Sequence, residues 1–187
     1  MTTERLIVRA RRDEDVPTLA AVLVRVHAVD AYPVEGVADP EAWLRHPREL
    51  RSWVAEVDGR PVGQVILTST RPDDDAARLW REDTGADIAD LVILARLFVD
   101  PDHRRVGAGQ LLVRAAFDHA HAHGNAVAFD VMAKDRAAIR LYERLGARRL
   151  GTTVHHHSDG LTEPAVVYVA ETDLFRQRAS RHVILSR

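Results

Sequence analysis

Apolar residues recur along this chain at two different spacings, which divide it into helices and strands. Apolar positions three or four residues apart predict a helix that starts within residues 13–17 and continues until Pro33. They also predict helices over 107–123 and 136–145, each burying one face. Shorter helices are predicted at 41–44 and 76–81. Alternating or continuous apolar runs predict strands at 6–10, 52–57, 62–70, 91–99, 126–132, 149–157 and 165–171.

The order of these elements indicates the fold class. Residues 52–70 are expected to form a β-hairpin, because Asp58-Gly59 suits a tight turn with positive backbone φ angles. The run 91–99 is apolar except for Arg96, which is typical of a strand buried on both faces. The helix at 107–123 connects it to the strand at 126–132. We therefore expect an α/β (α+β) fold with a mixed, mostly antiparallel sheet of six to seven strands, a central parallel strand pair and flanking helices.

The length of 187 residues fits one domain, expected over 1–175, followed by a basic tail over 176–187. The tail is more typical of a flexible end or a subunit contact than of a nucleic-acid arm, and a homodimer stays open. Without cysteine, the chain excludes disulfides, thiolate metal sites and a cysteine nucleophile. A net charge of −2 argues against a large nucleic-acid footprint but allows a local anion site.

No apolar run approaches the roughly 20 residues of a membrane-spanning helix. The polar N-terminus lacks the apolar core of a signal peptide, so a cytoplasmic location without membrane association is expected. Acidic residues crowd the segment 73–90, which we interpret as an insertion with one short helix capped by aspartates. A solvated loop is the default for this segment. The alternative is the wall of a binding site that favours cationic amines.

The segment around Gly107 and Gly109 carries the clearest chemical signal. A buried strand runs through Arg104 and Arg105 into a helix, so backbone N–H groups of the loop and the helix N-terminus converge where an anion could bind. Glycine lets a phosphate approach the backbone without a clashing Cβ. The dinucleotide fingerprint requires glycine where Leu112 stands, and the Gly-Lys-Ser/Thr of NTPase loops is missing. A tight strand-to-helix turn without a ligand is the structural alternative.

Two motifs in this chain resemble those of the GNAT superfamily of N-acetyltransferases. Residues 104–109, Arg-Arg-Val-Gly-Ala-Gly, are similar to that family's Arg/Gln-x-x-Gly-x-Gly/Ala pyrophosphate loop, and 97–101, Leu-Phe-Val-Asp-Pro, to the strand before it. Residues 135–147 resemble the family's Asn-x-x-Ala-x-x-Leu-Tyr-x-x-x-Gly-Phe segment, with Asp135 in place of Asn and Ala147 in place of Phe. Two motifs in the right order are more specific than either alone.

The resemblance implies an N-acetyltransferase that uses acetyl-coenzyme A as donor, without a metal, and a small-molecule or peptide amine as acceptor. It implies that the backbone of Leu97, Phe98 and Val99 binds the pantetheine arm and polarises the thioester carbonyl. It places Asp135 and Ala138 at the pantetheine end and Tyr142 beside the sulfur as general acid. The residues implied at the pyrophosphate are Arg104, Arg105, Val106, Gly107, Ala108, Gly109 and Gln110.

Several features stay open at the level of the sequence. Ile93 stands where many relatives have a strand carboxylate, so a general base has to come from elsewhere, with candidates Glu41, Asp39, Glu35 and His27. Neither the acceptor nor the preferred acyl length is specified. Tyr142 could instead be a core aromatic residue. The rival function is a non-catalytic acyl-CoA-binding regulatory module.

Histidines cluster at residues 155–157 and at 119, 121 and 123. Consecutive histidines on a hairpin are more often exposed than metal-bound, and histidine near a helix C-terminus suits the helix dipole. We therefore predict no metal site.

Overall fold

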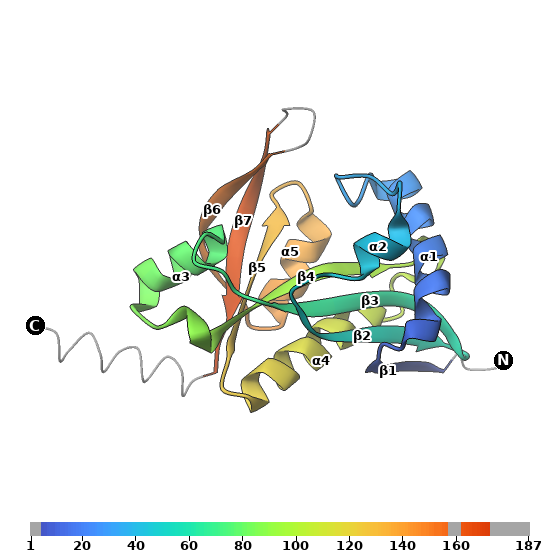
Figure 1. The fold of residues 1–187 in the computed structure, drawn as a ribbon, viewed down its shortest axis with the longest axis horizontal. Helices are drawn as coiled ribbons and strands as arrows, with labels where there is room; N and C mark the ends of the chain where they lie inside the picture. The colour runs from blue at the N-terminus through green and yellow to red at the C-terminus, as the bar shows by residue number, and fades with distance from the viewer. Residues whose placement is uncertain (1–4, 157–161, 173–187) are drawn as a thin grey trace, which may run out of the picture. The chain divides into compact units, whose positions relative to one another are not determined.

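The computed structural model describes residues 5–156 and 162–172, which contain seven strands and five α-helices (Figure 1). The strands lie in one sheet in the order β1-β2-β3-β4-β5-β7-β6, in which β4 and β5 are parallel. The pairs β1–β2, β2–β3, β5–β7 and β6–β7 are antiparallel. The predicted mixed sheet with a central parallel pair is therefore confirmed.

The chain divides into two compact units, each described here by itself. The first comprises residues 5–68 and 94–116, and the second comprises 69–93 with the described residues from 117 onward. Elements of the first unit are β1 (Leu6–Ala10), α1 (Val16–Asp30), α2 (Pro40–Leu44), β2 (Glu49–Val57) and β3 (Arg60–Ser69). Elements of the second are α3 (Asp75–Thr84), β5 (Ala126–Met132), α5 (Arg136–Arg144), β6 (Arg148–His156) and β7 (Thr162–Ala170). Both β4 (Leu91–Val99) and α4 (Ala108–Ala122) contribute residues to each unit.

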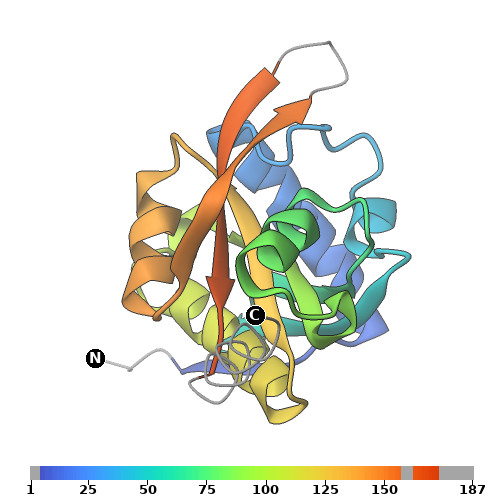
Figure 2. The ribbon, with the colours of Figure 1, turned by 90° about the vertical axis from the view of Figure 1, so that its left-hand side faces the viewer.

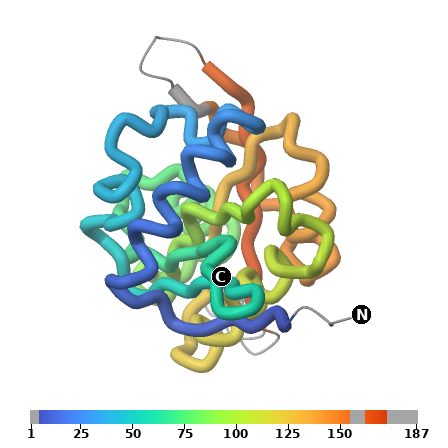
Figure 3. The backbone as a smooth tube through the Cα atoms, turned by 90° about the vertical axis from the view of Figure 1, so that its right-hand side faces the viewer, coloured from blue at the N-terminus to red at the C-terminus, as the bar shows by residue number. Residues whose placement is uncertain are grey.

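The core of the first unit lies under α1. Its buried apolar face packs with Leu44 of α2, Val54 of β2 and Phe98 of β4. Figure 3 shows α1 and α2, in shades of blue, side by side. The turn of the β2–β3 hairpin has φ of 48° at Asp58 and 84° at Gly59, as the Asp-Gly pair predicts.

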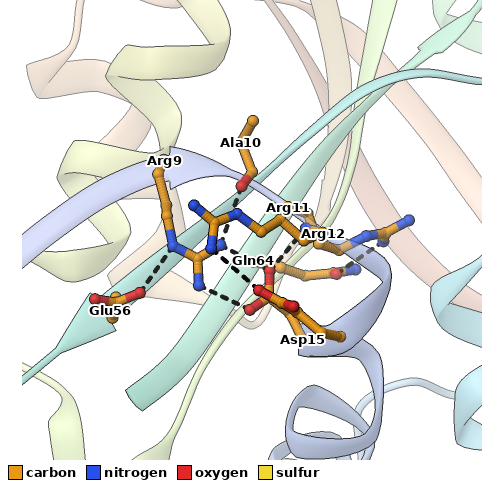
Figure 4. Close-up of polar contacts among 8 residues, drawn as sticks. Arg9, Ala10, Arg11, Arg12, Asp15, Glu56 and Gln64 are labelled. Carbon is orange, nitrogen blue, oxygen red and sulfur yellow. Dashed lines mark hydrogen bonds and ion pairs between the residues drawn. The ribbon is translucent and has the colours of Figure 1, made fainter. Parts of the chain in front are cut away.

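The start of α1 is held to the sheet by a buried carboxylate (Figure 4). Asp15 accepts two hydrogen bonds of 2.7 Å from the Arg9 guanidinium and one of 2.7 Å from the Arg12 backbone N–H. Arg9 also donates to Glu56 at 2.8 Å. The hydrogen-bonded Arg9 holds the pKa of Asp15 below its ordinary value, although burial opposes that shift.

The second unit packs helices on both faces of β5 and β7. Ala126 and Ala128 face α3 together with Val167 and Val169, whereas Phe129 and Tyr168 point to the opposite face, because side chains alternate along a strand. Figure 2 shows α3, in green, and α5, in orange, on opposite sides of these strands.

The acidic segment 73–90 differs from its expectation as a solvated loop. The helix predicted at 76–81 spans Asp75–Thr84, and it buries Ala76, Ala77 and Trp80 against the sheet. Asp74 stands at its N-terminus but accepts a hydrogen bond from the Arg71 backbone N–H at 2.7 Å instead of capping the helix. Small residues on β5 leave room for the indole, so this segment forms part of the core.

The residues that join β6 to β7 and those of the predicted basic tail, 176–187, lie outside the described part of the chain. His157 is among them. None of the described helices is long and apolar enough to cross a membrane.

Candidate functional site

The loop between β4 and α4 begins at an anchored aspartate. Asp100 is buried, its backbone N–H donates to the Val62 carbonyl oxygen at 2.7 Å, and its carboxylate accepts from the Asp102 N–H at 3.1 Å. Arg25 of α1 donates to Asp100 Oδ1 at 2.6 Å. These contacts fix the point at which the strand ends, and Pro101 begins the turn that follows.

The loop that follows presents its backbone to solvent. Arg105 has φ of 67° and Gly107 has φ of 94°, and both residues are exposed. Within the described part of the chain, the N–H groups of residues 107–110 donate no backbone hydrogen bond, whereas Leu111 N–H donates to the Gly107 carbonyl at 3.0 Å. Four unpaired N–H groups at a helix N-terminus are donors for an anion.

Two arginines lie in this loop, and their surroundings differ. Arg104 forms an ion pair with Asp30 at the end of α1, and its Nε donates to the Val99 carbonyl at 3.3 Å. Arg105 is exposed and has no ion pair within the described residues. Arg105 is therefore the guanidinium that an incoming anion meets without displacing a carboxylate.

Strand β4 is less regular and less buried than its sequence predicts. Ile93, residues 95–97 and Val99 are only partly buried, so burial on both faces is wrong for much of the strand. Arg96 has φ of 54°, a left-handed conformation that costs a non-glycine residue about 1–2 kcal/mol. A left-handed residue inside a strand interrupts the regular alternation of backbone groups and side chains, and so changes the direction in which its neighbours point.

Gly63 of β3 allows a close approach to β4 that the sequence motifs did not reveal. A Cβ on this residue would lie 2.5 Å from the Phe98 carbonyl oxygen and 3.1 Å from Val99 Cα. Only glycine fits there without displacing the β4 backbone. A buried glycine inside an apolar strand was the signal that could have found it.

The remaining predicted site residues belong to the second unit. Asp135 caps α5 by accepting a hydrogen bond of 3.0 Å from the Ala138 N–H. Tyr142 is buried on α5, and its ring centroid lies 4.2 Å from that of Phe129. The aromatic contact fixes the phenol ring on the face of β5 opposite α3.

The four candidate general bases, all in the first unit, differ in their environments. Asp39 caps α2 by accepting from the Ala42 N–H at 3.0 Å, and Glu41 pairs with Arg45 at 3.4 Å. Glu35 is exposed without an ion pair within the described residues. His27 has a buried Nδ1 without a hydrogen-bond partner there. His27 and Glu35 are thus less committed to structural contacts than Asp39 and Glu41.

The described residues contain no group of three or more histidine, aspartate or glutamate side chains that could hold a metal ion. His155 and His156 end β6, and their side chains are outside the description.

Residues 18–147 match the model of the acetyltransferase (GNAT) family. The chain belongs to the GNAT family. Both motifs identified in the sequence lie within the matched region, and the predicted resemblance is confirmed. The match covers residues 69–93 and 117–147 of the second compact unit, so it includes part of each unit.

Curated GNAT relatives include N-acetylaspartate synthetases from Rattus norvegicus and Homo sapiens, each 33% identical over 147 residues, or 78% of this chain. A probable N-acetyltransferase named camello, from Xenopus tropicalis, is 33% identical over 57% of the chain. The chain spans only 42% of the length of the two synthetases and 44% of the camello protein.

Solved structures confirm the GNAT fold. The Escherichia coli ribosomal-protein-S18-alanine N-acetyltransferase superposes with a TM-score of 0.64 at 20% identity, covering 88% of this chain and 92% of its own. Arabidopsis thaliana NAA60 in complex with acetyl-CoA gives a TM-score of 0.68 at 20% identity, covering 89% of this chain and 98% of its own.

Proposed function

We propose that this chain transfers an acetyl group from acetyl-CoA to a primary amine by direct attack in a ternary complex. The amine nitrogen forms a bond to the acetyl carbon, the thioester C–S bond breaks, and the amine loses a proton to a base. The thiolate of coenzyme A receives a proton from the Tyr142 phenol. Because the chain has no cysteine, the acetyl group cannot pass through a cysteine-bound intermediate.

The observation that carries the proposal is the loop at 104–110 within a GNAT family match. Its unpaired N–H groups, the positive φ of Gly107 and the unpaired charge of Arg105 fit a pyrophosphate. Backbone groups of Leu97, Phe98 and Val99 are proposed to bind the pantetheine arm and to stabilise the oxyanion at the thioester carbonyl. Two GNAT neighbours that were solved with acetyl-CoA support this donor.

Substitution of Gly107 tests the loop assignment. Open space surrounds the Cβ position of Gly107, so Gly107→Val would block the approach of a phosphate without a clash inside the protein. We expect acetyl-CoA affinity, measured by calorimetry, to fall at least tenfold. Gly85→Val is the matched control, because Gly85 also has positive φ and open space but ends α3. An affinity equal in both variants would contradict the assignment.

Substitution of Tyr142 tests the chemistry. Tyr142→Phe keeps the ring that packs on Phe129 and removes the hydroxyl, so kcat is expected to fall about 10²–10⁴-fold with acetyl-CoA binding retained. Tyr168→Phe is the control, since Tyr168 is also buried and donates to Glu143 at 3.0 Å. Equal turnover by the Tyr142 and Tyr168 variants would exclude the general-acid role.

Turnover separates this proposal from a non-catalytic acyl-CoA-binding module. Both functions predict a thermal shift on addition of acetyl-CoA, but only the enzyme releases free thiol faster when an amine is added. The acetyltransferase is favoured because the curated GNAT relatives carry enzyme names. The names of the synthetases make aspartate their acceptor, and we include it among the amines to be tested.

A further inference from the structure

Arg96 of β4 carries a partly buried positive charge. Its Nη1 donates to the Trp43 carbonyl oxygen at the end of α2, and the guanidinium carbon lies 4.6 Å from the Trp43 ring centroid. Within the described residues it forms no ion pair. Removing a charge from water, even in part, is costly, and an ion pair ordinarily offsets that cost.

Arg11, which reaches the same end of α2, shows the usual arrangement. It donates to the Leu44 carbonyl at 2.8 Å, one residue beyond Trp43, and to both carboxylate oxygens of Glu49 at 3.0 and 2.9 Å. Ser52 also donates to Glu49 at 2.6 Å. Because Glu49 is committed to Arg11 and Ser52, it is not available as the partner of Arg96.

The charges around Arg96 leave its burial uncompensated. Burial lowers the pKa of Arg96, and the weaker effects of Tyr32, Glu35 and Glu49 act in the opposite direction. A bound anion in contact with the guanidinium would offset this cost. The two glutamates make a dianion such as phosphate less favourable here than a single carboxylate.

A second donor without a partner lies beside Arg11. Gln64 of β3 is fully buried, and its Oε1 accepts from Arg11 at 3.0 Å, but its Nε2 has no hydrogen-bond partner within the described residues. A buried amide donor without a partner typically costs about 1–3 kcal/mol. Arg96 therefore supplies a guanidinium without an ion pair, and Gln64, held by Arg11, supplies an amide donor without a partner within the described residues. Both are groups that recognise a carboxylate.

We propose that Arg96 binds a carboxylate of the acceptor, so that the substrate class is an amino acid or another amine that carries a carboxylate. The inference rests on the proposed function, because Arg96 immediately precedes Leu97, the first residue assigned to the thioester. Only Nη1 of Arg96 donates a hydrogen bond within the described residues, which leaves the N–H groups of Nε and Nη2 without a partner there. Parallel N–H groups of a guanidinium match the two oxygens of a carboxylate.

The test compares acceptors that differ only in charge. Free thiol release from acetyl-CoA is measured with L-aspartate, L-glutamate, L-alanine and glycine, and with the α-carboxamide of each, alongside spermidine and glucosamine as amines without a carboxylate. We expect kcat/KM to be at least tenfold higher for the best amino acid than for its carboxamide. Arg96→Gln should lower kcat/KM for that amino acid about 10–100-fold, mainly through KM, and leave the carboxamide within threefold.

Two further variants separate recognition from a structural role. Arg96→Lys keeps the charge but loses the planar guanidinium, so its KM should lie between those of the wild type and Arg96→Gln. If Arg96→Gln does not fold, Arg96→Lys replaces it in the test. Arg51→Gln removes an exposed arginine from β2 and should leave the selectivity unchanged. Acetyl-CoA affinity should be the same in all of these variants.

The outcomes distinguish this inference from the proposed function. Equal kcat/KM for amino acid and carboxamide, or unchanged selectivity in Arg96→Gln, overturns the inference and leaves the acetyltransferase intact. Turnover with spermidine or glucosamine but with none of the amino acids would also overturn the inference and leave the acetyltransferase intact. Absence of turnover with every amine overturns both.

Discussion

The guanidinium of Arg104 is paired with the carboxylate of Asp30, which ends α1. A carboxylate beside the loop proposed to bind the pyrophosphate would repel the phosphates and compete for the arginine. Asp30→Asn should therefore tighten acetyl-CoA binding about two- to fivefold at low ionic strength, as expected for a charge within several ångströms in a surface dielectric. Calorimetric titration at two salt concentrations measures the effect.

The control for this variant removes one negative charge at a position away from the loop. Asp13→Asn removes an exposed carboxylate from the short turn that precedes α1 and should leave the affinity within a factor of 1.5 or so of the wild type. Weaker binding by Asp30→Asn would show instead that Asp30 holds Arg104 in the binding conformation.

Gly63→Ala should displace β4 where the pantetheine arm is proposed to bind. Its Cβ would lie 2.5 Å from Phe98 O, a backbone atom that cannot rotate away, so the expected loss of stability is about 1–3 kcal/mol. Weaker acetyl-CoA binding should accompany the loss. Gly151→Ala is the control in β6, since its Cβ meets only the flexible Leu79 side chain. Equal costs in urea unfolding would contradict the close approach as the cause.

The buried carboxylate of Asp15 predicts an acid-dependent loss of stability. Its pKa in the folded protein is below the value of about 3.9 expected in the unfolded chain, so the stabilisation is fully present above that value. It is lost as the pH falls through the folded pKa. The free energy difference between wild type and Asp15→Asn should therefore be largest near pH 7 and shrink below pH ~4. A difference independent of pH would contradict the ion pair with Arg9.

Trp80 should contribute more to stability than any exposed residue of α3. It is fully buried, and its indole Nε1 donates to Glu171 at 3.3 Å. Trp80→Phe leaves a cavity and removes that donor, with an expected cost of about 1–3 kcal/mol in urea unfolding. Arg81→Ala, at the next and exposed position, should stay within about 0.5 kcal/mol of the wild type.

Local signals in the sequence predicted the regular elements closely. The bounds of β1, β4 and β5 follow directly from their apolar runs, and the Asp58-Gly59 turn follows from its residue types. The loop at 104–110 was recognisable because its two arginines and two glycines lie close together in the sequence. These features depend on neighbours in the chain, so a single sequence contains them.

Contacts between distant segments were not predictable in this way. The approach of Gly63 to Phe98 depends on the position of β4 beside β3, and the left-handed backbone of Arg96 is imposed on a residue with no preference for it. The charge of segment 73–90 suggested solvent, but burial of Trp80 depends on alanines at 126 and 128. Predicting such contacts requires knowledge of which segments lie next to each other in the folded chain.

The left-handed backbone at Arg96 also sets stability and substrate choice against each other. Glycine at this position would relieve about 1–2 kcal/mol of backbone strain and remove a partly buried charge without an ion pair. It would lose the packing on Trp43 and cost about 0.4–1 kcal/mol through the greater freedom of the unfolded chain. If Arg96 selects the acceptor, laboratory evolution for heat resistance alone should replace it readily. Evolution for acetylation of carboxylate-bearing amines should retain it, so the two regimes would diverge first at this residue.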